Sequence, residues 1–535
     1  MELKRSGGVL MHISSLPSPY GIGTFGKAAY EFADFLKKSG QTYWQILPLG
    51  QTSYGDSPYQ SFSSVAGNPY FIDLDELAKE GLLRKADYEN ENFGTDAEYV
   101  DYSTIFKIRY KILDLAYQNA KSSAELTQQM AEFYKAQQHW LDEYALYMAI
   151  KEKMNLLSWQ EWDEDIKMRK PKALAHYETE LADRIGFWKF LQFCFFKQWY
   201  ALKDYANSLG IQIIGDIPIY VAADSVEAWA NPELFKFDKN RKPTVLAGCP
   251  PDVFTEGGQR WGNPIYNWDY HKKTGYKWWI NRIKNNLTMF DVIRIDHFRG
   301  FEAYWEFPAA DKTAANGKWV DGPKMELFYK IEEELGELNI IAEDLGHITP
   351  GLDAFLEEAG YPGMKVLQFA FYPKEPSSFL PYFYDKNCIV YTGTHDNDTL
   401  RGWIDTTGSP EDVKHCMKYL NVTDIDNLHW DIIRCAWASV SNLAIVQMQD
   451  LLGLGNEARM NLPSTLGGNW QWRVKAEDLS DELAKKLKDL TKLYGRDQGN
   501  PDVFSVQIVR RPIATVKKLA YKFDTKNMKH AKDFQ

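Results

Sequence analysis

Cysteine is scarce in this chain of 535 residues, and its few copies are not grouped. The five cysteines are widely spaced, odd in number and without a Cys-x-x-Cys pair, at Cys194, Cys249, Cys388, Cys416 and Cys435. This distribution predicts neither a disulfide framework nor a cysteine-based zinc site. It favours a reducing compartment.

Long apolar runs are also missing. No stretch approaches the roughly 18 consecutive apolar residues that a membrane span requires. The N-terminal residues lead directly into a short apolar strand at 8–13, without the apolar core of a signal peptide. We therefore expect a cytoplasmic protein that does not associate with membranes.

Positive charge is not in excess, because the formal net charge is −11. A nucleic-acid-binding protein needs a basic surface, so nucleic acid is not an expected partner. Aromatic residues make up 15% of the chain, including 18 Trp and 31 Tyr. Their flat apolar faces suit the stacking of sugar rings, although a large core also packs many aromatics.

Short apolar segments recur along the chain with helical patterns between them, the first helix falling at 28–38. Eight such strands are expected, near residues 9, 44, 212, 293, 341, 367, 390 and 445. Alternating strands and helices favour a parallel sheet, and eight units favour closure. The predicted fold class is α/β, a (β/α)8 TIM barrel with inserted subdomains over its C-terminal face.

Two insertions divide the predicted barrel. In the first, large apolar residues, most of them aromatic, recur at helical spacing, and we expect them to form its core rather than a binding surface: Phe133, Trp140, Tyr144, Tyr147 and Met148. The second is rich in Pro, Gly and Asn, and its run at 248–264 has the composition of a loop lid. The expected parts are 1–74, first barrel strands and loops; 75–184, a mainly helical insertion; 185–220, barrel; 221–285, a loop-rich insertion with an active-site lid; 286–520, the remainder of the barrel; and 521–535, a tail.

Carboxylates follow three of the predicted strands. Arg294 and Asp296 lie two residues apart and therefore on one face of a strand, where the cation favours an ionised carboxylate. Glu343 and Asp396 come after two later strands. Because barrel active sites are built at the carboxyl ends of the strands, we expect the three carboxylates to form one site.

Paired carboxylates are typical of chemistry at an acetal, which needs an acid for the leaving oxygen and a carboxylate at the anomeric carbon. Asp296 and Glu343 fit a retaining pair, and Asp396 fits a stabiliser of the transition state. Each alone has a structural alternative, as a helix cap or a partner of arginine. His297 and His395 are expected to donate hydrogen bonds to sugar hydroxyls, because no third ligand stands at zinc-like spacing. Neither a metal nor a cofactor is expected.

Longer motifs carry a resemblance to a known family. Together with the three carboxylate segments, residues 8–23, 43–49, 57–61 and 461–470 closely resemble the amylomaltase, or 4-alpha-glucanotransferase, family of the alpha-amylase clan. The resemblance runs from about residue 5 to about residue 475. It implies that Asp296 is the nucleophile, Glu343 the acid/base and Asp396 the stabiliser.

The resemblance also implies residues that bind substrate. Arg294 and His395 match positions beside the cleaved bond, Tyr59 matches an aromatic near the donor sugar, and Asp216 lies in a matching strand-end motif. The run from Gly257 to Trp261, which includes Gln259, matches a loop over the groove. An alternative for Trp261 is that it only anchors this loop to the barrel.

The implied activity is transfer of an α-1,4-glucan segment to the 4-hydroxyl of another glucan or of glucose, by retaining double displacement. The expected partners are α-1,4-glucans and maltooligosaccharides. Two alternatives stay open, a retaining α-glucan hydrolase and a glucan-binding protein without catalysis. The sequence leaves the oligomeric state, the acceptor length and the formation of cyclic products undecided.

Overall fold

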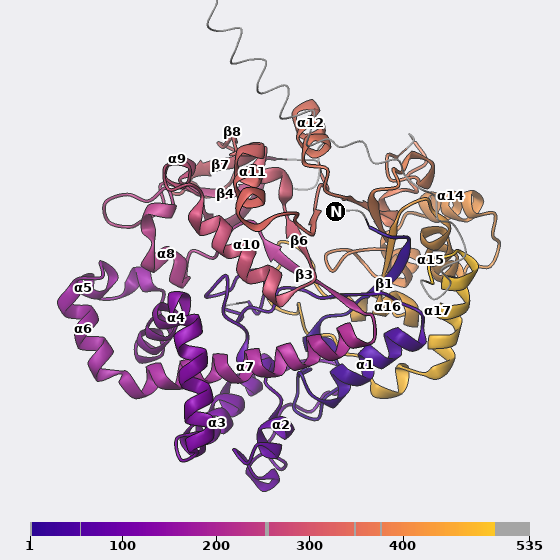
Figure 1. Cartoon of the computed structure of the whole chain (residues 1–535). Helices are drawn as coiled ribbons and strands as arrows, with labels where there is room; N and C mark the ends of the chain where they lie inside the picture. Colours follow the sequence, from indigo (N-terminus) through magenta and orange to yellow (C-terminus); the bar gives the residue numbers. More distant parts are fainter. Residues whose placement is uncertain (1–2, 54, 252–255, 347–348, 375–376, 498–535) are drawn as a thin grey trace, which may run out of the picture. The chain divides into compact units, whose positions relative to one another are not determined.

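The centre of the molecule is an eight-stranded parallel sheet, seen in a computed structural model that describes residues 3–53, 55–251, 256–346, 349–374 and 377–497 (Figure 1). Its strands, in the order in which they pair, are β10 (Gly363–Val366), β11 (Cys388–Tyr391), β12 (Leu443–Gln447), β1 (Ser6–Leu10), β2 (Tyr43–Gln45), β3 (Gln212–Pro218), β6 (Val292–Asp296) and β9 (Ile340–Ala342). A backbone hydrogen bond from Ala342 to Pro362, 3.0 Å, joins the end of β9 to the residue before β10. The sheet therefore closes, and the predicted (β/α)8 barrel is confirmed.

All eight strands lie near their predicted positions, with one change at the sixth. The strand expected near residue 367 lies slightly earlier, because β10 ends at Val366 and residues 367–369 form a 3-10 turn. The side chain of Gln368 donates to the carbonyl of Asp398, 2.7 Å, in the loop after β11. This bond directs the chain after β10 toward the loop after β11, so the chain leaves the hydrogen-bonded sheet at Val366.

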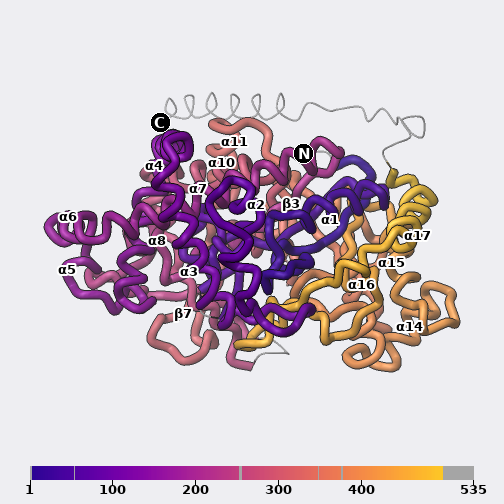
Figure 2. Tube along the Cα trace, turned by 90° about the horizontal axis from the view of Figure 1, so that it is seen from below, coloured from indigo at the N-terminus to yellow at the C-terminus, as the bar shows by residue number. Residues whose placement is uncertain are grey.

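Helices alternate with the strands and cover the outside of the sheet. The longer ones are α1 (Lys27–Lys38), α7 (Ala182–Ser208), α10 (Lys277–Met289), α11 (Lys324–Leu335), α12 (Pro350–Ala359), α14 (Pro410–Leu420), α15 (Leu428–Ala438) and α17 (Asp481–Leu493). The predicted helix at 28–38 is α1, which packs Phe32 on Trp44 of β2 with ring centroids 4.9 Å apart. Helices α1 and α17 lie side by side (Figure 1, Figure 2), and Lys38 pairs with Asp481 across them at 3.1 Å.

Residues 75–184, expected as the first insertion, lie mostly in helices. These helices are α2 (Leu74–Lys79), α3 (Tyr102–Ala120), α4 (Ala124–Lys153), α5 (Glu164–Lys167) and α6 (Pro171–Glu180). On α4, Tyr144, Tyr147 and Met148 are fully buried, and Phe133 packs on Phe193 of α7 with centroids 5.8 Å apart. Tyr144, Tyr147 and Met148 therefore belong to the core, and the half-buried Phe133 and Trp140 pack against it.

Helix α7 belongs to both the insertion and the barrel. Its first half packs on α4, and its second half reaches the barrel, where the Trp199 indole donates to the carbonyl of Met289, 3.2 Å. The expected boundary between 184 and 185 falls inside this helix. The division into separate subdomains stays a prediction, and the tail expected at 521–535 lies outside the described residues.

A second sheet was not predicted. It is antiparallel, in the order β5 (Gln259–Pro264), β4 (Val245–Cys249), β7 (Ala303–Pro308) and β8 (Lys318–Asp321), and it lies near the short helices α8 (Val226–Ala230) and α9 (Trp268–Lys273) in Figure 1. The prediction of a loop over 248–264 was wrong at its ends, because residues 259–264 pair with β4. The central pair, β4 with β7, joins segments on either side of β6, so no local pattern indicated it.

The two ends of the described chain meet at strand β1. This strand pairs with β2 on one side and with β12 on the other. The buried side chain of Arg496, which follows α17, donates to the carbonyls of Ser6 at 2.9 Å and Asn442 at 3.2 Å. Arg496 thus holds the starts of β1 and β12 together.

Within the described ranges, no helix combines the length and the apolar character needed to cross a membrane. The five cysteines all lie in these ranges and form no disulfide.

Candidate active site

Arg294 on strand β6 joins two carboxylates at the carboxyl end of the barrel. One of its terminal nitrogens lies 2.8 and 2.7 Å from the two oxygens of Asp216, on β3, and 3.0 Å from Oδ1 of Asp296. The Arg294 and Asp216 side chains are buried, whereas that of Asp296 is 31% exposed. A buried, charge-assisted contact fixes one oxygen of Asp296 while the carboxylate stays open to the rim.

Glu343, which directly follows β9, is buried beside Asp296. Its two oxygens accept backbone N–H bonds of 2.7 Å each, from His297 and from Leu345. Burial, and secondly the charge of Asp296, raise the pKa of Glu343 to about 8, although Arg294 and the two N–H groups oppose the shift. Glu343 therefore has a structural role and is also kept protonated near neutral pH.

Asp396 comes from the loop after β11. Its Oδ1 accepts a hydrogen bond of 2.7 Å from the side-chain amide of Asn461 and lies 3.4 Å from Nε2 of His395. The Asp396 side chain is 45% exposed, the most open of the three carboxylates. It is thus accessible to a ligand above the barrel.

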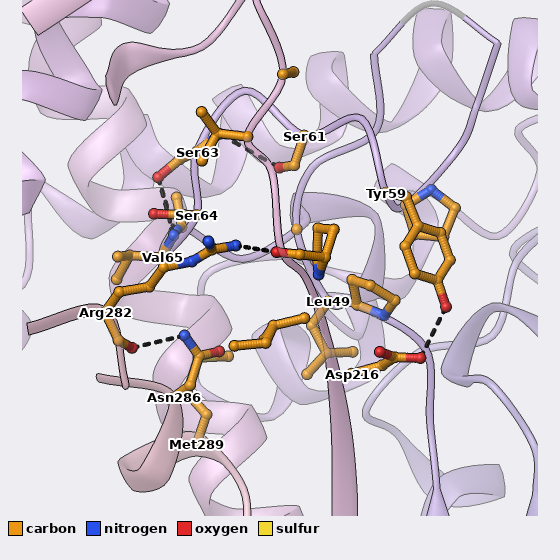
Figure 3. Close-up of a pocket in the computed structure, with 18 of the residues that line it drawn as sticks. Leu49, Tyr59, Ser61, Ser63, Ser64, Val65, Asp216, Arg282, Asn286 and Met289 are labelled. Carbon is orange, nitrogen blue, oxygen red and sulfur yellow. Dashed lines mark hydrogen bonds between the residues drawn. The ribbon is translucent and has the colours of Figure 1, made fainter. Parts of the chain in front are cut away.

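Tyr59 connects opposite parts of the rim. Figure 3 shows its hydroxyl directed at Asp216, to which it donates at 2.9 Å. Its ring stacks on that of His395, with centroids 5.0 Å apart and planes 19° apart. Tyr59 and Asp216 also line a cavity of about 50 Å³ (Figure 3), bordered by Ser61 and Arg282.

Trp261 on β5 reaches the residue after Asp296. Its ring meets the His297 ring edge to face, with centroids 4.7 Å apart, and its indole N–H donates to Gln259 at 3.1 Å. His297 has a left-handed backbone, with φ of 53°, and burial lowers its pKa to about 4, so that the ring is neutral. The contact places Trp261 above the site. It is compatible with both interpretations of Trp261, as a cover over the glucan groove and as an anchor of the loop to the barrel.

Three further residues support the loop between β11 and α13 (Leu400–Gly402), and none of them was predicted as a site residue. The buried carboxylate of Asp450 accepts from the Thr392 hydroxyl at 2.6 Å and from the N–H of Leu400 at 2.7 Å. Asp450 lies in α16 (Met448–Leu452), the helix that directly follows β12. Its place just beyond a barrel strand, like that of Asp296 and Glu343, is a signal that could have identified it from the sequence. Asn461 begins the stretch 461–470 that carries part of the family resemblance, and Arg459 lies just before it, but nothing in the local pattern indicated their contacts with the Asp396 loop.

Metal-binding groups were not expected. In the part of the chain that the structure describes, no three His, Cys, Asp or Glu side chains are grouped as a metal site would require. That the protein acts without a metal remains a prediction.

A closed barrel with acidic side chains at the ends of β6, β9 and β11 defines a barrel enzyme with a carboxylate-based active site. A family model described as 4-alpha-glucanotransferase matches residues 11–479. The chain belongs to this family of glycosyl-transferring enzymes, as the resemblance predicted.

Relatives match over almost their whole length. A 4-alpha-glucanotransferase of Clostridium butyricum is 54% identical over 91% of this chain and all of that protein. One of Thermus thermophilus is 46% identical over 93% of this chain and all of that protein. Among solved structures, the amylomaltase of Streptococcus agalactiae in complex with acarbose is 47% identical, with a TM-score of 0.90 over 92% of this chain and all of that one.

Proposed function

We propose that the protein transfers a segment of an α-1,4-glucan to the 4-hydroxyl of another glucan or of glucose. The observation that carries this proposal is Asp296, held by Arg294, next to a buried Glu343 whose pKa is raised. One carboxylate is open for attack while the other keeps a proton to give. These are the two protonation states that retaining transfer requires.

In the first half of the proposed reaction, Asp296 attacks the anomeric carbon of the bound glucan. Glu343 gives its proton to the glycosidic oxygen, and the bond between that oxygen and the anomeric carbon breaks. The glucan on the acceptor side leaves with a free 4-hydroxyl. The rest stays covalently bound to Asp296 with inverted configuration.

In the second half, Glu343 is ionised and acts as a base. It takes the proton from the 4-hydroxyl of an incoming sugar, whose oxygen attacks the anomeric carbon and displaces Asp296. The second inversion restores the α configuration. Asp396 and His395, at the rim, bind sugar hydroxyls, and Tyr59 and Asp216 border the sugar that reacts.

Water competes with the sugar acceptor in this second half. Trp261 and Gln259, held on strand β5 above His297, would cover the bound glucan and limit the access of water. This arrangement favours transfer over hydrolysis.

Incubation with maltotriose tests the proposal. Transfer yields longer maltooligosaccharides together with glucose, which chromatography resolves. Shorter sugars alone would identify the alternative, a retaining α-glucan hydrolase. Unchanged maltotriose that still binds the protein would identify a non-catalytic glucan-binding protein.

We further propose a cytoplasmic location, with glucans as partners and neither nucleic acid nor membrane. Five cysteines without a disulfide fit a reducing compartment, and the net charge of −11 does not favour binding to phosphate backbones.

A further inference from the structure

We infer that Arg459 is a positioning residue, which fixes Asp396 through the short segment 459–461. The inference rests on the proposed role of Asp396 as the group that stabilises the transition state. In the described structure, Arg459 contacts neither Asp296 nor Glu343. Its action on the reaction is therefore indirect.

The guanidinium of Arg459 uses all three of its nitrogens on the Asp396 loop and the adjacent segment. One terminal nitrogen donates to the backbone carbonyl of Asp396, and the other pairs with Oδ1 of Asp398, each at 2.5 Å. The Nε–H donates to the carbonyl of Asn461 at 2.8 Å. One side chain thus ties the backbone of Asp396 to the segment that carries Asn461.

Asn461 completes this connection from the other side. Its amide donates to Oδ1 of Asp396 at 2.7 Å, and its backbone N–H donates to the carbonyl of His395 at 3.1 Å. Met460, between the two polar residues, is buried and accepts a contact of 3.5 Å from the Ser15 hydroxyl. The segment is therefore anchored in the core and provides a fixed support.

The other contacts of this loop leave the Asp396 carboxylate and carbonyl without a comparable support. Asp450 fixes the loop at Thr392 and at Leu400, four residues on either side of Asp396, and Gln368 donates to the carbonyl of Asp398. The N–H of Asp396 donates to the Thr394 hydroxyl at 3.3 Å, a contact within the loop itself. The side chain of Asp396 is 45% exposed, so it can adopt other rotamers that water solvates. A displacement of about 1 Å in a site of this kind can reduce the rate on the order of 10²-fold.

An arginine is needed because the three acceptors lie around one planar group. A lysine has the same charge but is a compact ammonium on a flexible stem, and it cannot present the same fork of donors. Arg459→Lys keeps the charge opposite Asp398 and removes the geometry. This substitution therefore separates positioning from electrostatics.

The experiment measures kcat and KM for maltotriose disproportionation in purified Arg459→Lys. Because the interaction with Asp396 strengthens in the transition state, we expect kcat to fall by about 10- to 100-fold while KM changes by less than about threefold. Arg401→Lys is the matched control. Arg401 also makes a branched set of contacts near this loop, to Asp405 and the carbonyl of Ile425, but not to Asp396.

A double-mutant cycle then tests whether Arg459 acts through Asp396. The cycle combines Arg459→Lys with Asp396→Asn and uses an α-glucosyl fluoride donor, whose leaving group needs little protonation. We expect the lysine substitution to slow the Asp396→Asn variant by less than about twofold. An equal fold-change in both backgrounds would overturn the inference, as would an unchanged kcat in the single variant.

Two further variants keep the outcomes distinct. If Arg459→Lys does not fold, Asn461→Ala takes its place, because it removes only the amide contact with Asp396, and the same kcat loss and cycle are expected. If Asp396→Asn alone retains full activity, the proposed role of Asp396 fails. If Asp396→Asn is inactive while Arg459→Lys and Asn461→Ala behave like the wild type, only the positioning inference fails.

Discussion

Glu343 combines two demands that usually conflict in one side chain. Its oxygens satisfy two backbone N–H groups, from His297 and Leu345, which favours a carboxylate. Burial beside Asp296 outweighs them and raises its pKa to about 8. The residue can therefore be held rigidly by the backbone and still carry the proton that a leaving glucan needs.

This shift predicts the pH dependence of the enzyme. As the pH rises through about 8, Glu343 loses its proton, and kcat/KM for maltotriose should fall. Stability should change in the same direction. The folded chain keeps a proton that the unfolded chain releases above its ordinary pKa of 4.5, so this group lowers the free energy of unfolding as the pH rises from about 4.5 to about 8. Initial rates and thermal unfolding across this range check both statements.

Glu343→Gln is the control for this assignment. It should lower the rate on maltotriose on the order of 10²- to 10⁴-fold and remove the alkaline limb of the profile. Formation of the glycosyl-enzyme from an aryl or fluoride α-glucoside should suffer less, because such leaving groups need little protonation. Equal slowing of both donors in a single-turnover measurement would show that Glu343 is not the acid.

Asp296→Asn should abolish turnover without unfolding the protein. The amide cannot form the covalent intermediate, whereas its shape still fits beside Arg294. Activity and thermal melting of a contamination-checked preparation provide the measurement. Transfer above a few per cent of the wild-type rate would contradict the assignment of the nucleophile.

At the scale of elements, strand β5 brings Trp261 above His297, and the contact has a testable effect on specificity. We expect Trp261→Ala to raise the ratio of hydrolysis to transfer on maltotriose, because water gains access to the glycosyl-enzyme. Both products are measured side by side. An unchanged ratio with normal thermal stability would favour the alternative that Trp261 only anchors the strand.

Sequence patterns located the barrel strands and the residues at their ends because both depend on local order. Asp296, Glu343 and Asp396 each follow a short apolar run, and strand geometry alone puts Arg294 on the side of Asp296. The contact of Arg459 with the Asp396 loop could not be predicted from local sequence patterns. Arg459 is distant from Asp396 in sequence, and only the closed fold brings the two residues together.

The antiparallel sheet shows the same limit for a whole element. Strands β4 and β5 are short, include glycine and lie in a segment with the composition of a loop. Strand β5 pairs with β4, and β4 pairs in turn with β7, which follows β6 in the sequence. Local propensity carries little information about such non-local pairs.

At the scale of the whole molecule, we predict that prolonged treatment with EDTA leaves the activity unchanged. Across the described ranges, no cluster of acidic or histidine side chains offers the several oxygen or nitrogen ligands that a divalent ion needs. Activity before and after chelation is the measurement. Loss of activity that an added divalent ion restores would contradict a metal-independent reaction.

The junction of β1 with β12 bears on how the protein is made in the cell. Among the barrel strands, β1 is synthesised first and β12 last, and Arg496, which joins the two strands, follows β12. One edge of β1 therefore stays open during most of translation, and an open edge can pair with another chain. Asp450, Arg459 and Asn461 also follow β12, so a growing chain acquires the support of Asp396 only when the barrel is ready to close. Synthesis of residues 443–496 is thus expected to close the open edge of β1 and to complete the support of the active site in the same stage.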